Sequence, residues 1–206
     1  FEGLGIAEDI GSAALSSAAT AVLATAMLPV TALQSVSRLD DPWSVVASRV
    51  DEAGEQLAEV LLSRVHGERP VTLVGYSVGA RLIFHALSYM AEHHPEDARG
   101  VVDDVVLLGG TMSDDAEAWA KVRSVTCGRL VNGHCDRDWL LALLYRYKSW
   151  NLGVAGLGPV ECAGVDNVDL REVIASHTDY GAPGCVARCL ELCGFEGEGG
   201  GLENDW

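Results

Sequence analysis

The 206-residue chain is 49% hydrophobic, which is enough for one globular domain with a substantial core. Its 30 acidic residues outnumber 14 basic ones, for a formal net charge of −16. This charge repels phosphates, and no basic stripe is present, so the composition excludes nucleic-acid binding. No signal-peptide pattern opens the sequence. We therefore expect an intracellular protein whose six cysteines are reduced.

The first segment is an uncharged run from Ile10 to Ser37, rich in Ala, Ser, Thr and Leu. It is longer than the roughly 20 residues that span a bilayer. Many hydroxyl groups, Gln34 and Pro29 lower its hydropathy. Two interpretations stay open, a buried or peripheral helical hairpin and a segment that inserts into or docks on a membrane. We expect residues 1–39 to form an apolar helical segment of this kind.

The next segment has the pattern of an amphipathic helix. Asp41 and Pro42 suit an N-cap and a first helical position, and the pattern ends near Arg64. Apolar residues recur at helical spacing, which predicts one stripe that faces the core. The stripe consists of Val46, Val50, Ala53, Leu57, Val60 and Leu61.

A short apolar run, Val71–Val74, then leads into Gly75-Tyr76-Ser77-Val78-Gly79, and a helical pattern follows from Arg81 to His94. The motif G-x-S-x-G between a strand and a helix is typical of a nucleophile elbow, in which a tight turn exposes a serine. We expect Gly75 and Gly79 to let strand and helix approach closely. The alternative is an ordinary strand-to-helix turn that contains a serine.

The rest of the chain alternates between predicted strands and helices. This alternation predicts an α/β fold with a parallel sheet and flanking helices. After it we expect a disordered acidic tail at 194–206. Strands are predicted at 101–110 and 127–132 with a shorter one at 154–160, and helices at 114–123, at 139–145 and after Pro183-Gly184.

Three cysteines, Cys185, Cys189 and Cys193, recur every four residues and so share one helical face. Together with His177 or Glu191 they would supply four potential zinc ligands. This helical spacing is unusual for structural zinc, so we expect buried thiols and no metal. Acylation of cysteines near a membrane is a third option.

Three polar residues occur in the chain order that a hydrolytic triad of this fold requires, namely serine, acid, histidine. Ser77 follows the first predicted strand, Asp138 the third, and His177 the last strand-like run. Asp136 competes as the acid, but Asp138 directly precedes a helix and is therefore better fixed. Simpler roles stay open, a helix cap for Asp138 and a surface-loop position for His177.

Several stretches between Asp40 and Tyr180 closely resemble the transmembrane and coiled-coil domain-containing family of eukaryotic α/β-hydrolase-like proteins. The resemblance implies an α/β-hydrolase fold, lipase or esterase activity and membrane association. By motif position it implies Ser77, Asp138 and His177 as the triad. The stretches are 70–81, 106–110, 128–133, 138–141, 154–160, 167–170 and 176–180.

The sequence also departs from this fold, because residues 1–69 contain no convincing strand. We expect the chain to be truncated at its N-terminal side, with an α/β-hydrolase-like domain at 40–193. An earlier loop normally supplies the second amide of the oxyanion hole, so only the amide of Val78 is identified by motif.

These observations give two hypotheses. The first is a serine hydrolase that cleaves an acyl ester, such as a lipid, and needs no cofactor or metal. The alternative is a catalytically silent, membrane-associated adaptor or trafficking protein with the same fold.

Overall fold

The computed structural model describes residues 40–146 and 153–195, and the side chains of 46–142 and 153–195. The expectations for residues 10–37 and for the tail beyond residue 195 lie outside this range. In chain order the elements are α2 (Asp40–Leu62), β1 (Val71–Tyr76), α3 (Val78–His93), β2 (Val102–Leu108), α4 (Ala116–Ser124), β3 (Leu130–His134), α5 (Trp139–Arg146), β4 (Val165–Asp169), the 3₁₀ helix η1 (His177–Gly181) and α6 (Cys185–Leu192).

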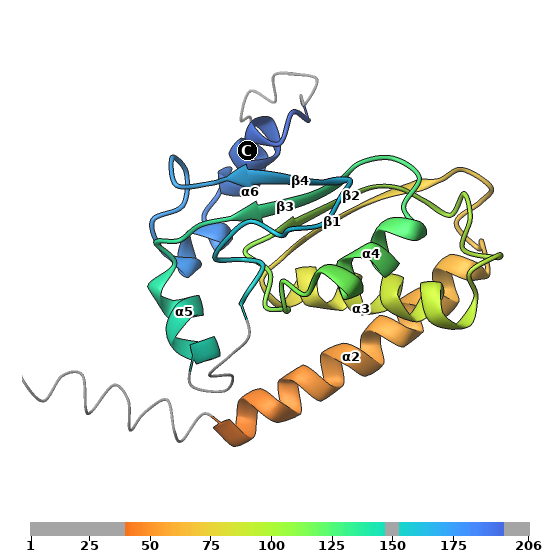
Figure 1. Cartoon of the computed structure of the whole chain (residues 1–206), viewed down its shortest axis with the longest axis horizontal. Helices are drawn as coiled ribbons and strands as arrows, with labels where there is room; N and C mark the ends of the chain where they lie inside the picture. The colour runs from red at the N-terminus through yellow and green to blue at the C-terminus, as the bar shows by residue number, and fades with distance from the viewer. Residues whose placement is uncertain (1–39, 147–152, 196–206) are drawn as a thin grey trace, which may run out of the picture. The chain divides into compact units, whose positions relative to one another are not determined.

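The described strands form one parallel sheet in the order β1-β2-β3-β4. Figure 1 shows α3 and α4 on one face of this sheet and α6 on the other. The predicted class, an α/β fold with a parallel sheet and flanking helices, is confirmed. Since all four strands are parallel, their carboxyl ends lie together, and every loop that follows a strand starts there.

Strand β2 explains why both faces of the sheet are covered. Its side chains alternate, so that Val105 and Leu107 pack with α3 and α4 while Val106 and Leu108 pack with α6 and η1. All four are fully buried. A strand that is apolar on both sides is the pattern expected for a parallel sheet between two layers.

Helix α2 forms where it was predicted, but only part of the predicted stripe is buried. Leu61 lies in the core and Leu57 packs against it, whereas Val46 and Val60 are 40% and 51% exposed. Ala58, which is not in the predicted stripe, is also in the core. The close approach of α2 to α3 occurs at Gly54, where a Cβ would come within 3.0 Å of the Leu82 carbonyl oxygen. The smallest residue of the helix therefore decides which face turns inward.

The predicted strand at 154–160 is wrong. This segment is a loop with one isolated bridge, and the fourth strand is Val165–Asp169. Two asparagines hold the loop on the sheet. The Asn132 side-chain amide donates to the Gly158 carbonyl (3.1 Å), and the Asn167 side chain bonds both the N–H and the C=O of Val160 (2.8 and 3.0 Å).

Helix α6 buries the three cysteines that were predicted to share one of its faces. Cys185, Cys189 and Cys193 pack in one core cluster with Tyr180 and Leu170. All three thiols are free. The face is therefore part of the core that covers the sheet on the α6 side.

The pH dependence of stability tests this burial. Burial, with the nearby Cys185 thiol adding to it, raises the pKa of Cys189 from 9.0 to about 12. Above about pH 9 the unfolded thiol loses its proton while the folded one keeps it, so rising pH favours the unfolded state. We expect the free energy of unfolding to fall more steeply between pH 9 and 12 in the wild type than in Cys189→Ala.

Denaturant titrations at a series of pH values measure this difference. Cys127→Ala is the control, because that thiol is exposed. It should keep the wild-type dependence on pH. Equal slopes for Cys189→Ala and the wild type would contradict the burial of this thiol.

Candidate active site

The turn between β1 and α3 presents Ser77 in an unusual backbone conformation. Ser77 has φ 52° and ψ −121°, and it lies between the last residue of β1 and the first residue of α3. An L-residue with positive φ is strained and persists only where its surroundings enforce it. One such constraint is the Ser77 amide, which donates to the Leu108 carbonyl at the end of β2 (2.9 Å).

Gly75 makes this turn possible. A Cβ at Gly75 would lie 2.8 Å from the carbonyl carbon and oxygen of Gly79 and 2.8 Å from Ile83 Cδ1. Backbone atoms cannot yield to such a contact, so a side chain at position 75 would push strand and helix apart. Gly79 was expected to have the same role, but within the described part of the chain a Cβ there meets nothing within 4 Å. The close approach therefore requires one glycine and not two.

His177 reaches this turn from the other side of the sheet, where β4 is the last strand in the order. It is the first residue of η1, which follows β4. The Asp179 carboxylate fixes the start of η1, because Oδ2 accepts from the amides of Ala175 and Ser176 (2.8 Å each). The sequence predicted a loop at this point, and the short helix is what holds the His177 backbone in place.

The structure brings Ser77, His177 and Asp138 into one chain of hydrogen bonds. Ser77 Oγ lies 2.6 Å from His177 Nε2, and His177 Nδ1 lies 2.5 Å from Asp138 Oδ2. A carboxylate oxygen can only accept, so Nδ1 carries the proton that faces Asp138. In a neutral imidazole Nε2 is then the acceptor, and the serine hydroxyl donates to it.

Asp138 both caps a helix and faces the histidine. Its Oδ1 accepts from the Leu141 amide at the start of α5 (3.0 Å), while Oδ2 faces His177. The side chain is fully buried. Asp136, the competing acid, is 61% exposed and lies 3.6 Å from the Arg171 guanidinium. The helix cap is therefore what orients the second carboxylate oxygen toward the histidine.

The two residues beside Ser77 have different environments. Val78 is the first residue of α3, where backbone N–H groups have no acceptor within the helix. This amide and the positive end of the helix are suited to an anionic oxygen near Ser77. Tyr76 is half-exposed, and its ring stacks on that of Tyr180 with centroids 6.1 Å apart.

An ion pair that was not predicted from the sequence supports the site. Arg81 lies one helical turn after Ser77, and its guanidinium binds the Asp51 carboxylate through two nitrogens (3.0 and 2.8 Å). A third nitrogen donates to the Thr111 carbonyl (3.3 Å). Arg81 thus ties α3 to α2 and to the loop after β2. An acidic residue on the predicted helix and an arginine next to the motif were the only signals in the sequence.

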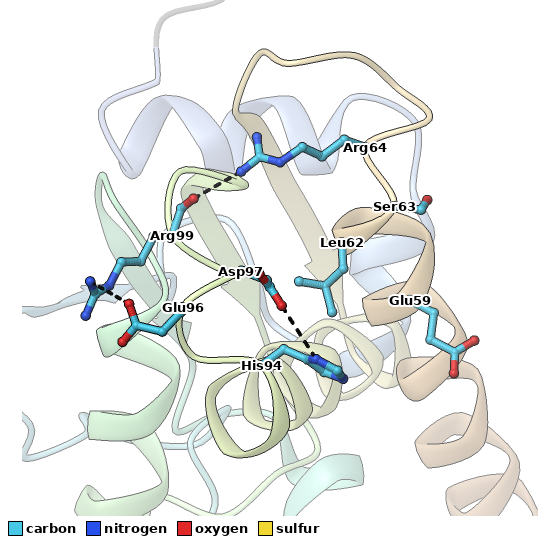
Figure 2. Close-up of a pocket in the computed structure, with 8 residues that line it drawn as sticks. All are labelled: Glu59, Leu62, Ser63, Arg64, His94, Glu96, Asp97 and Arg99. Atoms are coloured by element: carbon cyan, nitrogen blue, oxygen red, sulfur yellow. Dashed lines mark hydrogen bonds and ion pairs between the residues drawn. The ribbon is translucent and has the colours of Figure 1, made fainter.

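A concave region lies away from Ser77, near the start of β1 (Figure 2). It encloses about 690 Å³ and is lined largely by charged side chains. These side chains engage one another, since Arg99 pairs with Glu96 (2.9 Å) and Arg64 donates to the Arg99 carbonyl (3.1 Å). Ser77 follows the carboxyl end of β1 and is not among the residues that line this cavity.

Among residues 46–142 and 153–195, no group of three or more His, Cys, Asp or Glu side chains is placed to hold a metal ion. Within the described ranges, no helix combines the length and the apolar character that crossing a bilayer requires.

Comparison with known proteins places this site in context. Residues 6–195 match the model of a family described as a protein of unknown function, DUF726. A membrane protein of Caenorhabditis elegans, F35D11.3, is 43% identical over 81% of this chain and 27% of its own length. The transmembrane and coiled-coil domain-containing protein STS1 of Oryza sativa is 40% identical over 81% of this chain and 25% of its own length.

A third relative has a name that refers to an activity. It is "Probable lipase MIL1" of Saccharomyces cerevisiae, which is 36% identical over 78% of this chain and 15% of its own length. The chain thus spans about a quarter or less of the length of these relatives. No solved structure matches it.

The two glycines of the turn provide a matched pair for a stability test. We expect Gly75→Ala to lower the free energy of unfolding by about 2 kcal/mol or more, because the added methyl group collides with backbone. Gly79→Ala should leave stability unchanged or raise it by up to about 1 kcal/mol, since alanine favours the helix. Urea titration measures both. A tolerated alanine at position 75 would contradict the close contact.

Proposed function

This chain belongs to the DUF726 family, and we propose that it is a serine hydrolase that cleaves an acyl ester through Ser77, His177 and Asp138. The observation that supports the proposal most strongly is the chain of two hydrogen bonds that joins these side chains. A serine hydroxyl is a weak nucleophile until a base takes its proton, and that base needs a fixed tautomer. Each requirement has a side chain with suitable geometry here.

In the proposed reaction Ser77 Oγ attacks the ester carbonyl carbon and transfers its proton to His177 Nε2. Asp138 stabilises the imidazolium that forms, while the Val78 amide donates to the carbonyl oxygen as it becomes negative. The tetrahedral intermediate then collapses, and His177 returns the proton to the departing alcohol. Water, deprotonated by His177, finally releases the acid from Ser77.

The turn at Ser77 supports the same proposal. Strand β1, the turn at Ser77 and helix α3 follow one another in the order expected for a nucleophile elbow, and Ser77 has a strained backbone with positive φ. Strained backbone conformations of this kind are common at active sites, and they persist only where the surrounding fold stabilises them. Gly75, Tyr76 and Gly79 would be the flanking residues of the elbow.

A lipid ester at a membrane is the substrate class that we propose. Two relatives are named as membrane or transmembrane proteins and a third is named a probable lipase. The exposed aromatic rings of Tyr76 and Trp139 directly adjoin Ser77 and Asp138 in sequence, and aromatic side chains of this kind suit contact with apolar acyl groups.

Kinetics with a series of p-nitrophenyl esters tests the proposed function. Ser77→Ala and His177→Ala should each lower kcat by on the order of 10⁴-fold or more, and the double variant should lose little beyond either single one. Residues that act as a unit show this lack of additivity. Asp138→Asn should also reduce kcat by about 10⁴-fold, because the amide favours the wrong imidazole tautomer.

Two controls match these variants. Asp136→Asn alters an exposed acid two residues from Asp138 that pairs with Arg171. Ser63→Ala removes an exposed serine that follows α2 and lies beside the cavity near the start of β1. Both should keep the wild-type kcat. Hydrolysis that survives in Ser77→Ala would exclude this serine as the nucleophile, and a wild type without hydrolysis would favour the silent adaptor.

A further inference from the structure

The ring of Tyr180 lies where three parts of the candidate site meet. It follows His177 by three residues in η1, and the two rings contact edge to face with centroids 5.7 Å apart. Its ring also stacks on Tyr76, the residue before Ser77. Gly109 packs against the same ring, since a Cβ at this position would come within 2.6 Å of it. One side chain thus contacts the Ser77 turn, the loop after β2 and the histidine.

The Tyr180 hydroxyl contributes little to this arrangement. The residue is 1% exposed, and its buried hydroxyl oxygen has no hydrogen-bond partner among the residues that the structure describes. Burial, with the Asp138 carboxylate adding to it, raises the pKa of Tyr180, so the hydroxyl stays protonated at neutral pH. A neutral hydroxyl without a partner cannot orient a neighbour. What Tyr180 offers His177 is therefore the shape of its ring.

The orientation of His177 needs such a support. The 3₁₀ helix that holds it has only five residues, and short 3₁₀ segments have poor hydrogen-bond geometry. Asp179 fixes the backbone at the start of η1, and its carboxylate bonds the amides of Ala175 and Ser176, not the imidazole. Gly109 has φ +52° and no side chain, which leaves the space that the Tyr180 ring fills.

We propose that Tyr180 is a positioning residue for His177, whose buried ring keeps the imidazole aligned between Ser77 and Asp138 and whose hydroxyl is dispensable. The inference rests on the proposed function, since alignment of His177 affects a rate only if the site reacts. It adds a specific claim, which is that a flat ring at position 180 is required and that a phenyl ring is sufficient.

Two substitutions at position 180 test the proposal. Tyr180→Leu keeps an apolar side chain but removes the flat ring, and it should lower kcat for ester hydrolysis by about 100-fold with KM nearly unchanged. Tyr180→Phe should keep the wild-type kcat and KM. ¹⁵N NMR of the histidines should detect the bonded Nδ1–H of His177 in the wild type and in Tyr180→Phe, and a mixture of tautomers in Tyr180→Leu.

Two more variants separate positioning from stability. Val131→Ala weakens the same core cluster within β3, so it should lower the midpoint of denaturation and leave both kcat and the His177 spectrum unchanged. Gly109→Ala pushes on the Tyr180 ring without removing it, and should reproduce the kinetic and spectral loss of Tyr180→Leu. It keeps the proposal testable if Tyr180→Leu does not fold.

Several outcomes would overturn the proposal. Loss of activity in Tyr180→Phe would assign the role to the hydroxyl, and a Tyr180→Leu enzyme with wild-type kcat and spectrum would remove the role altogether. The NMR result does not depend on catalysis. An inactive wild type whose His177 signal still changes in Tyr180→Leu would refute the hydrolase and retain the positioning role.

Discussion

The contact between Gly75 and the start of α3 is the constraint on which the rest of the site depends. Without a side chain at position 75, the backbone of Gly79 can approach the end of β1, and the chain turns from strand into helix within one residue. Ser77 then takes a positive φ, and its amide meets the end of β2. A wider turn would move the serine hydroxyl away from the carboxyl ends of the strands, where the other loops begin.

The parallel sheet explains how residues far apart in the chain meet there. Ser77 and His177 are separated by 100 positions, and His177 and Asp138 by 39. Each residue nevertheless follows the carboxyl end of a strand of the same parallel sheet. Local structure then aims each side chain. The cap of α5 uses one oxygen of Asp138 and leaves the other for His177, and the packing of Tyr180 supports the imidazole.

The sequence was informative where local chemistry decides the structure. Periodicity located α2 and α3, and the apolar runs located β1 and β2, because both depend on which residues the core covers. The chain order of Ser77, Asp138 and His177 led to three side chains that the structure brings together. Polar long-range bonds were not predictable in this way. Asn132 and Asn167 hold 154–160 as a loop despite its apolar composition, and β4 is a polar edge strand that resembles a loop. Val60 looks like core on the helix but is exposed, since Gly54 sets the contact with α3.

Covalent labelling shows whether Ser77 is a nucleophile that His177 activates. A fluorophosphonate reacts with an activated serine and leaves a stable adduct that peptide mass spectrometry can locate. We expect an adduct on Ser77 in the wild type and none in His177→Ala, although the serine is still present there. An adduct on another residue, equal labelling of His177→Ala, or no adduct in the folded protein would contradict it.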